Sequence, residues 1–419
     1  MEQIIAIHVN KDGFILKNIE NDAIVEIDKH FYNELMLKEK NTIQNLIDNN
    51  FFVTDKKNKS LSIVIVSTTK CNLKCSYCFE SHIHEHTTLR DDDTRKIFNF
   101  IEHNLKRGIF DTLDITFTGG EPLTNSTLLK ELIAELNDIS DRYYVKRKYS
   151  IISNGTIIST QILSLLDENN FEIQISLDGP KEIHNLYRIY KNNEVSFDKI
   201  IDNITYLAIN SNHIRITIRI NITTKNLDEL KRLYDSLYKK YKEYSKITIY
   251  FDFLDVSKDH FLYFSDIEKI NTLSEIYLMI YNRTNEVPRY YTIGSNCMIK
   301  NNNSVTIHSN GDLYKCYSLV GIDEYKEKSC DYPTINIESI KPLSNYCEDD
   351  DCVYHKICLG GCPFHQCSIG NGISIDCHYK ILDEINKLYF ALDLHKYGYI
   401  KLSNIRRVVQ NVQIIKIDI

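Results

Sequence analysis

Three cysteines near residue 75 have the residue type and spacing of a metal centre. Cys71, Cys75 and Cys78 are separated by three and then by two residues. Thiolates spaced in this way suit iron–sulfur clusters or zinc. A structural zinc site needs four ligands, usually from two close pairs, whereas this run offers three cysteines with no fourth nearby. We therefore expect an iron–sulfur cluster that leaves one iron open to a small molecule.

The other nine of the twelve cysteines lie between residues 297 and 377. In a reducing cytosol, cysteines grouped so closely indicate metal rather than disulfides. Zinc stays open as an alternative for this second group, because pairs of nearby cysteines are also typical of zinc sites. The sequence thus predicts two metal-binding regions that are far apart along the chain.

The composition is that of an ordinary folded protein of 419 residues, long enough for two or three domains. A nucleic-acid binder would normally present a strongly basic face, which the net charge of −7 argues against. No apolar run reaches the length of a membrane span, and the first residues lack the basic and apolar regions of an export signal. We expect a cytoplasmic protein with no nucleic-acid or membrane partner.

Alternating strand and helix patterns between residues 61 and 254 must position the first three cysteines. The run 61–67 is short, apolar and β-branched, so it predicts a buried strand that ends just before Cys71. Such alternation predicts a parallel sheet with right-handed crossovers. α/β barrels place their chemistry on the loops that follow the carboxyl ends of such strands. Strands are predicted at 61–67, 113–117, 148–152, 172–177, 214–220 and 247–253, and helices near 92–107, 124–140, 159–168, 196–209 and 227–242.

The segments on either side of this region are predicted to form separate structural units. Residues 4–9 and 14–17 predict a hairpin, followed by helical patterns and a short strand at 51–53. Residues 304–314 predict a second hairpin with an Asn-Gly turn, which would hold Cys316 rigidly. Residues 383–394 predict an amphipathic helix, and 399–419 one or two strands. The predicted domains are 1–60, 61–270, 271–380 and 381–419.

Polar and glycine-rich motifs follow successive predicted strands. Because the carboxyl ends of parallel strands share one edge of the sheet, we expect these motifs to gather at one rim and to face the cysteine loop. A Gly-Gly or Asn-Gly pair alone is an ordinary turn signal, but four motifs in register are not explained as turns. The motifs are Phe117 to Pro122, Ser153 to Thr156, Ser176 to Pro180, and Arg219 to Asn221.

The three cysteines, with aromatic Tyr77 just before the last, resemble the radical SAM superfamily. The resemblance implies an α/β fold, a partial (β/α)6 TIM-like barrel. It also implies that the catalytic residues Cys71, Cys75 and Cys78 hold a 4Fe-4S cluster, whose open iron takes the amino and carboxylate groups of S-adenosylmethionine. Reductive cleavage would then give a 5′-deoxyadenosyl radical that removes a hydrogen atom from the substrate.

The same resemblance assigns the rim motifs to the cofactor. Gly119, Gly120 and Glu121, with Thr118, match the motif that grips the amino group. Arg188 matches an arginine that pairs with the cofactor carboxylate, as its planar donors suit. His184 is either a family residue or a packing histidine. Asn154 and Ser176 would meet the ribose or the carboxylate, Tyr77 would lie near the adenine, and Asn221 is a weaker candidate at the same rim.

The later cysteines resemble the SPASM extension, a C-terminal Cys-rich domain that binds two auxiliary iron–sulfur clusters. Three 4Fe-4S clusters are therefore expected in all. One departure is a gap of four residues after Cys347, with Asp349 where the family has a cysteine, and Cys367 has no assigned role. Matching positions place Cys347, Cys352, Cys358 and Cys377 on one cluster. They place Cys297, Cys316 and Cys362 on the other cluster. The fourth position of the latter cluster is either Cys330 or an open iron that binds a substrate thiolate.

These resemblances imply an enzyme that installs a cross-link, with a thioether as the first choice, in a ribosomally made and Cys-containing precursor peptide. Its electron would come from a flavodoxin- or ferredoxin-type reductant. Residues 1–60 resemble the small peptide-recognition domains of such enzymes, and a plain packing extension stays open. One alternative is an anaerobic sulfatase-maturing enzyme forming formylglycine, although Tyr317 stands where that family has an aspartate base. Another is a zinc-binding scaffold without turnover.

Overall fold

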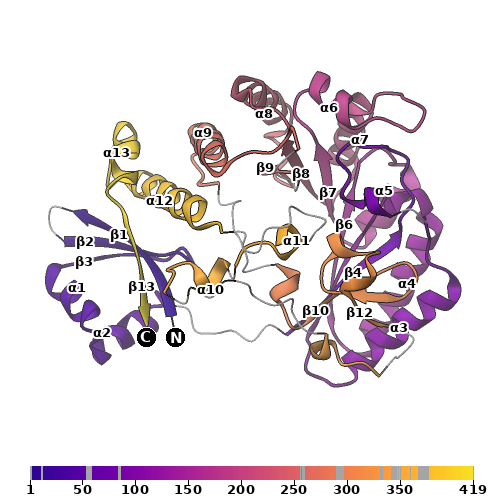
Figure 1. Ribbon diagram of the computed structural model, residues 1–419, viewed down its shortest axis with the longest axis horizontal. Helices are drawn as coiled ribbons and strands as arrows, with labels where there is room; N and C mark the ends of the chain where they lie inside the picture. Colours follow the sequence, from indigo (N-terminus) through magenta and orange to yellow (C-terminus); the bar gives the residue numbers. More distant parts are fainter. Residues whose placement is uncertain are drawn as a thin grey trace.

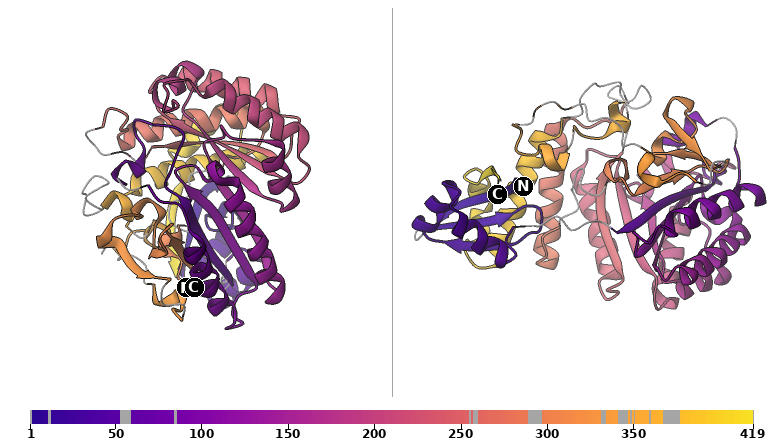
Figure 2. Two further views of the ribbon diagram at one scale, coloured as in Figure 1. Left: turned by 90° about the vertical axis from the view of Figure 1, so that its right-hand side faces the viewer. Right: turned by 90° about the horizontal axis from the view of Figure 1, so that it is seen from below.

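The computed structural model describes residues 2–10, 13–52, 59–83, 86–254, 256, 260–288, 297–330, 334–340, 347, 349, 351–358, 360–366 and 377–418. Two sheets form the framework, one at each end of the molecule (Figures 1 and 2). Within the described ranges, no helix is both long and apolar enough to cross a lipid bilayer.

The smaller sheet combines the two ends of the chain. Its strand order is β13-β1-β2-β3, and each neighbouring pair is antiparallel. The predicted hairpin is confirmed as β1 and β2, and the C-terminal strand β13 pairs with β1, so Ile5 lies opposite Ile415. The elements are β1 (Glu2–Asn10), β2 (Gly13–Asn18), β3 (Ile24–Ile27), β13 (Gln413–Asp418), α1 (Lys29–Met36) and α2 (Lys40–Asp48).

Apolar side chains of the small sheet and of α1 and α2 form a core of their own. It includes Ile5, Leu16, Leu35 and Leu46. The strand predicted at 51–53 is wrong for Phe51 and Phe52, which lie outside any strand but are buried in this core. Their aromatic and β-rich composition reflects burial, which the sequence pattern does not separate from strand pairing. Val53 lies outside the described residues.

The larger sheet contains the six predicted strands in parallel and in chain order, which confirms the α/β barrel prediction. Five helices return between these strands, and all five were predicted. The strands are β4 (Ser60–Thr68), β5 (Thr112–Gly119), β6 (Lys146–Ser153), β7 (Glu172–Leu177), β8 (Arg215–Ile222) and β9 (Ile247–Phe253); the helices are α3 (Asp91–Leu105), α4 (Ser126–Arg142), α5 (Thr160–Glu168), α7 (Phe197–Asn210) and α8 (Leu227–Tyr241).

Two helices of this region were not predicted. α6 (Lys181–Tyr187) is short and starts directly after Pro180, so its sequence reads as a turn. α9 (Asp266–Thr284) begins with a capping box between Ser265 and Glu268, and its buried residues occupy more than one stripe. That broad apolar surface lies against α12 (Tyr379–Lys396) (Figure 1). The presence of α12 confirms the helix predicted at 383–394.

The predicted second hairpin extends the barrel sheet. It consists of β10 (Ser304–Ile307) and β11 (Asp312–Tyr314), and β12 (Lys326–Ser329) continues the antiparallel pairing. β10 also pairs in parallel with β4, so that Val305 lies beside Ile63 and Ile307 beside Ile65. The carboxyl end of β10 therefore reaches the same rim as the cysteine loop that follows β4.

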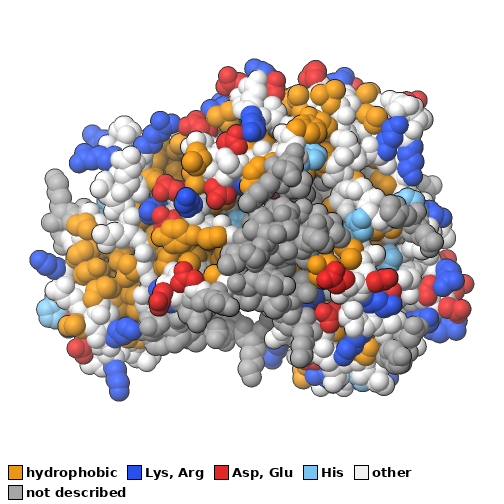
Figure 3. All heavy atoms as spheres, in the orientation of Figure 1, with side chains coloured by type: hydrophobic (Ala, Val, Ile, Leu, Met, Phe, Trp, Pro, Cys, Tyr) orange, Lys and Arg blue, Asp and Glu red, His pale blue; other side chains and the backbone are white. Residues whose placement is uncertain are grey.

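Between this hairpin and α12, the described residues form only short elements. Segment 399–419 contains one strand, preceded by a short helix, instead of a second strand. Acidic and basic side chains are interspersed over the face drawn in Figure 3. The short elements are η1 (Phe79–His82), η2 (Pro122–Asn125), η3 (Met298–Lys300), η4 (Tyr317–Leu319), η5 (Asp323–Tyr325), η6 (Ile337–Ser339), α10 (His355–Cys358), α11 (Pro363–Gln366), η7 (Leu402–Asn404) and α13 (Ile405–Val409).

A buried ion pair connects the small sheet to α12. Lys17 of β2 donates from Nζ to Asp393 of α12 over 2.6 Å, and the two side chains are 3% and 2% exposed. A buried pair contributes little net stability, but removing Lys17 would leave the buried Asp393 carboxylate without this cation, which costs about 3–5 kcal/mol. Lys17 itself also pairs with Asp22 over 2.9 Å. The pair therefore fixes how the two ends of the chain fit together.

Candidate functional site

A cavity of about 400 Å³ lies at the carboxyl ends of the barrel strands. It brings together residues that follow five different strands, as the positions of the motifs predicted. All three N-terminal cysteines line it. Of the other predicted cofactor residues, those that line it are Tyr77, Thr118, Gly119, Gly120, Asn154, Ser176, Arg188 and Asn221.

The cysteine loop after β4 is held from two sides. On one side, the Asn72 side chain donates to Thr156 Oγ1 over 2.8 Å and accepts from Asn154 Nδ2 over 2.8 Å. On the other, Lys74 N–H donates to the Ile189 carbonyl over 2.9 Å, and Leu73 bridges to Tyr190. The loop is therefore positioned by polypeptide contacts alone.

The three thiols are close enough to influence one another's ionisation. Burial is the main cause that raises the pKa of Cys71 to about 11 and that of Cys78 to about 12. Negative charge on Cys75 raises both further. Desolvated thiols that repel each other as thiolates fit a site completed by positive metal, which takes the place of the protons.

The arrangement fits a cluster better than a single ion. Among the described residues, no three His, Cys, Asp or Glu side chains converge on one metal-ion position. In a 4Fe-4S cluster each thiolate binds a different iron, so the three sulfurs need to line one cavity rather than meet at a point. Cys71, Cys75 and Cys78 meet that requirement.

The glycine pair after β5 is required by the cysteine loop itself. A Cβ on Gly119 would lie 2.0 Å from the Thr68 carbonyl oxygen, and one on Gly120 would lie 2.5 Å from that of Lys70. Gly119 also has a φ of 133°, which L-residues with a side chain rarely adopt. We predicted that these glycines let a ligand approach, and the structure adds that they let the strands β4 and β5 end side by side.

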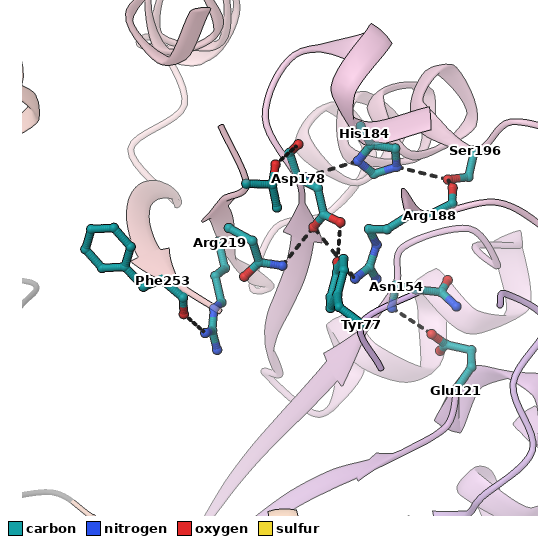
Figure 4. Close-up of polar contacts among 11 residues, drawn as sticks. Tyr77, Glu121, Asn154, Asp178, His184, Arg188, Ser196, Arg219 and Phe253 are labelled. Carbon is teal, nitrogen blue, oxygen red and sulfur yellow. Dashed lines mark hydrogen bonds and ion pairs between the residues drawn. The ribbon is translucent and has the colours of Figure 1, made fainter. Parts of the chain in front are cut away.

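Glu121 makes contacts other than the predicted one with a cofactor amine. Its carboxylate is fully buried outside the cavity and accepts hydrogen bonds from Leu123 N at 3.0 Å, Ser153 Oγ at 2.9 Å and Asn154 N at 2.7 Å. Burial raises the pKa of Glu121, and these three donors oppose that shift. The carboxylate therefore braces the loop that presents Asn154 to the cavity (Figure 4).

A buried charged network lies beside the cavity, around Tyr77 and Arg188 (Figure 4). Asp178 has no exposed surface, accepts from the Tyr77 hydroxyl, and accepts from Asn221 Nδ2 over 2.8 Å. Arg188 Nη1 donates to the Tyr77 hydroxyl over 3.1 Å and lies 3.9 Å from Asp178 Oδ1. The tyrosine predicted beside the adenine thus directs its hydroxyl to this ion pair.

Arg188 remains a cation with unused donors. Burial alone would lower the pKa of Arg188, but electrostatic interaction with Tyr77, Cys75 and Asp178 raises it well above the ordinary value. Its Nε is buried and has no hydrogen-bond partner among the described residues. A guanidinium that lines the cavity and retains a spare buried donor fits a carboxylate ligand.

His184 is a packing histidine with a defined tautomer. Its Nδ1 accepts from Asp178 N–H over 3.1 Å, and its Nε2 donates to Ser196 Oγ over 2.9 Å, because that hydroxyl itself donates to the Arg188 carbonyl over 2.6 Å. Burial lowers the pKa of His184 to about 3, so the ring is neutral. It holds Asp178 and Arg188 in place and does not line the cavity.

Three of the auxiliary cysteines pack into one small apolar group. Cys297, Cys316 and Cys362 lie together with Ile299, Leu319 and Phe364. Burial raises the pKa of Cys316 to about 12, with a contribution from Cys297. Cys330 is not in this group; it packs in the barrel core, where its N–H donates to the Gly311 carbonyl over 2.8 Å. The structure therefore does not bring Cys330 to the other three.

The cysteines assigned to the second auxiliary group lie near one another. Cys352 and Cys358 share an apolar group with Tyr354. Burial raises the pKa of Cys352, and negative charge at Cys347 and Cys377 contributes, so all four sulfurs belong to one neighbourhood. Asp349 caps the intervening turn by accepting from Cys352 N–H over 3.1 Å, which shows how the longer gap is spanned. Cys367 lies outside the described residues.

Sequence reasoning missed Asp178 and did not place Tyr317 at the cavity. Asp178 lies inside a motif that we singled out, but only the fold shows that its carboxylate contacts Tyr77 and Asn221. Tyr317 and Ser318 follow Cys316 and line the cavity because β10 joins β4. This parallel pairing of distant segments has no local sequence signal.

Comparison with known proteins agrees with this geometry. Residues 65–237 match the sequence model of the radical SAM superfamily. A cysteine-type anaerobic sulfatase-maturating enzyme of Clostridium novyi (strain NT) is 35% identical over 190 residues, which is 44% of this chain and 49%, about half, of that protein. Residues 65–237 therefore match a radical SAM domain, and a domain of this kind implies S-adenosylmethionine and a 4Fe-4S cluster. The relatives whose names state an activity, such as this maturating enzyme, are enzymes.

Two solved structures resemble the whole fold. Native anSMEcpe with bound AdoMet and Cp18Cys peptide has a TM-score of 0.57 at 20% identity, covering 84% of this chain and 99% of that one. Streptococcus suis SuiB bound to precursor peptide SuiA has a TM-score of 0.54 at 15% identity, covering 88% and 98%. At these identities the likeness shows the fold alone.

Proposed function

We propose that this chain, which carries a radical SAM domain, is a peptide-modifying enzyme that cross-links a ribosomally made peptide. The observation that carries the proposal is that the three N-terminal cysteines and the polar residues of five strand ends line one cavity. Tyr317, from the cysteine-rich region, lines the same cavity. A substrate in that cavity would therefore lie between the two metal-binding regions.

The chain's own residues would bind and orient the cofactor. Cys71, Cys75 and Cys78 would hold the cluster, and Arg188 would pair with the cofactor carboxylate. When bound, cluster and S-adenosylmethionine supply a 5′-deoxyadenosyl radical that removes a substrate hydrogen atom. The polypeptide would hold the reacting atoms close and exclude water, for which the apolar side chains of Leu73, Ile83, Ile152 and Leu254 line the cavity.

The auxiliary cysteines support a thioether as the bond formed. Among the described residues, four thiols stand near one another around Cys352, and three, Cys297, Cys316 and Cys362, share the other group. With Cys330 in the barrel core, a cluster on those three would keep one iron open. A thiolate of a Cys-containing precursor peptide would bind there. Cp18Cys and SuiA are the peptides bound to anSMEcpe and SuiB, and we extend peptide binding to this chain.

The small sheet is proposed to receive another part of the same peptide. Its edge strand β3 ends the order β13-β1-β2-β3, and an edge strand is where an extended peptide can add through main-chain hydrogen bonds. Binding of a labelled precursor peptide to the full chain, with and without a competing excess of its N-terminal half, tests this role. Equal binding in both conditions would leave the sheet as a packing element.

The decisive experiment combines metal analysis and mass spectrometry. After anaerobic purification and reconstitution, we expect brown protein with about twelve iron atoms per chain, the content of three 4Fe-4S clusters. With a flavodoxin- or ferredoxin-type reductant it should release 5′-deoxyadenosine, and each cross-link should lower the mass of a Cys-containing precursor by about 2 Da, the mass of two hydrogen atoms. Zinc in place of iron, or an intact cofactor under reductant, would refute the proposal.

Sulfatase maturation is the second candidate, favoured by the Clostridium novyi relative. Formylglycine formation needs a base near the substrate, and the residue that follows Cys316 at the cavity is Tyr317 rather than a carboxylate. A tyrosine is a much weaker base at neutral pH, which favours cross-linking. Conversion of a sulfatase peptide to its formylglycine form would reverse this order.

A further inference from the structure

One histidine lies between the loop of the N-terminal cysteines and the loop that follows Cys316. His82 ends η1, the short turn that starts directly after Cys78. Its Nδ1 lies 2.8 Å from the carbonyl oxygen of Phe79, and its Nε2 lies 2.9 Å from that of Val320, the residue after η4. The imidazole thus contacts both loops, although it does not itself line the cavity.

The chemistry of the two partners determines the protonation of the ring. Carbonyl oxygens only accept hydrogen bonds, whereas a neutral imidazole has one N–H donor and one nitrogen lone pair. A lone pair facing a carbonyl oxygen at less than 3 Å would be repulsive. Only the imidazolium, which donates from both nitrogens, satisfies both contacts of His82.

We infer that His82 is a positioning residue, which as an imidazolium clamps the loop of Cys78 to the loop of Cys316. The identity of the two loops as cluster loops rests on the proposed function, whereas the clamp rests on the geometry of His82. Its role is to fix the wall that carries Tyr317 over the cavity.

Apolar contacts on either side of His82 support the clamp. The Phe79 ring meets Tyr317 edge-on, with centroids 5.8 Å apart, and packs against the apolar group that contains Cys316. A Cβ on Gly321, with its φ of +84°, would lie only 3.3 Å from Ile83. The turn after Val320 therefore approaches η1 closely, and these contacts bring the two carbonyl oxygens within reach of one ring.

Other titratable groups of the packed elements must be separated from His82 in any pH experiment. Burial raises the pKa of Glu80, in η1, to about 7, so Glu80 also ionises near neutral pH. The variant Glu80→Gln removes this contribution while it leaves the two carbonyl contacts of His82 available. Among the described residues of 79–86 and 317–325, the other titratable side chains are His86, Tyr317, Asp323, Glu324 and Tyr325.

Hydrogen exchange on the anaerobically reconstituted holoenzyme tests the clamp. The readout is protection of the amides in 317–322, corrected for intrinsic exchange rates, at about pH 6 and about pH 8.5, which bracket the range where histidines change charge. We expect wild type to lose about tenfold protection at the higher pH, because one hydrogen bond to a charged donor is lost. Glu80→Gln should keep this response, and so should His213→Gln, which changes an exposed histidine before β8.

His82→Gln should show the low protection at both pH values, since it cannot become a cation. Unchanged protection in wild type between the two pH values would overturn the inference, and so would a wild-type response in His82→Gln or its loss in Glu80→Gln. If His82→Gln does not fold, the wild-type and Glu80→Gln comparisons still decide. Iron content and cofactor cleavage measured on the same sample test the proposed function separately.

Discussion

The rim of the barrel and the cysteine-rich region after residue 297 hold their thiols in different ways. At the rim, side-chain hydrogen bonds from Asn72 and Asn154 and backbone bonds to segment 187–190 fix the loop of Cys71. In the later region the cysteines directly precede or belong to turns and helices of three or four residues, such as η4 and α10. Regular structure positions the first set, and apolar contacts position the second.

The difference indicates where bound metal contributes most to folding. A loop braced by the barrel can keep its shape before a cluster binds. Short turns contribute few backbone hydrogen bonds of their own, so metal binding there would supply part of the folding free energy. The barrel rim thus behaves as a preformed site, and the later region as one completed by its clusters.

Cysteine substitutions test this difference with the largest expected effects. Cys75→Ala should remove about four iron atoms and abolish cofactor cleavage, with the melting temperature little changed, since the barrel core supports the loop. Cys352→Ala should also remove about four iron atoms, but it should lower the melting temperature and retain cofactor cleavage. Iron analysis, 5′-deoxyadenosine release and thermal unfolding check both variants.

Cys330→Ala is the matched control for these two variants. Because Cys330 packs in the barrel core, its loss should leave the iron content unchanged. An iron loss in Cys330→Ala equal to that of Cys352→Ala would contradict its exclusion from the auxiliary sites. A destabilised Cys75→Ala would contradict the preformed rim.

Asp178→Asn tests the buried charged network at the rim. Replacing this fully buried carboxylate leaves the Arg188 cation without its buried counter-charge, which should cost about 3–5 kcal/mol of stability. We also expect the affinity for S-adenosylmethionine to fall about tenfold or more, because Tyr77 and Arg188 lose their orientation. Denaturant unfolding and equilibrium binding measure the two effects.

Asp252→Asn provides the control on the same rim. Asp252 pairs with Arg219 over 3.1 Å but is 41% exposed, so its loss should cost less than about 1 kcal/mol. Equal costs for the two aspartates would show that burial of Asp178 is not what makes the network important.

Substitutions at two glycines compare the stability cost of an added Cβ at the rim with that in the hairpin. Gly120→Ala should displace the cysteine loop and cost about 2–4 kcal/mol, because its Cβ would lie 2.5 Å from a backbone oxygen. Gly311→Ala, in the hairpin turn, has its nearest neighbour at 3.9 Å and should cost only about 1 kcal/mol for its φ of +87°. Unfolding free energies test both, and a larger loss in Gly311→Ala would reverse the comparison.

The sequence predicted the rim better than the contacts behind it. Periodicity identified all six barrel strands, so the motifs that contain Thr118, Asn154 and Ser176 could be assigned to one cavity. The hydrogen-bond partners of Glu121 could not be predicted, because its donors come from the next strand end and depend on three-dimensional packing. The parallel pairing of β10 with β4 could not be predicted either, since it joins segments with no local pattern in common.

In the auxiliary region, the sequence could group nearby cysteines but could not predict which distant ones meet. Cysteine spacing alone grouped Cys352 with Cys347, Cys358 and Cys377, although the elements between them are too short for periodicity to detect. The same spacing could not exclude Cys330, because its position depends on β12 joining the barrel sheet. Spacing predicts local ligand sets, whereas the sheet topology decides which distant cysteines meet.

The pH dependence of the unfolding free energy tests whether the rim depends on a neutral histidine. Burial lowers the pKa of His184 from 6.5 to about 3, so the folded protein binds this proton more weakly than the unfolded chain. The stabilisation is complete above pH 6.5 and is lost as the pH falls toward 3. Between pH 7 and pH 5 it should fall by about 2 kcal/mol. His184→Gln should be less stable at pH 7 but lack this part of the slope, and parallel pH profiles from denaturant unfolding would show that His184 does not hold Asp178 and Arg188 as a neutral ring.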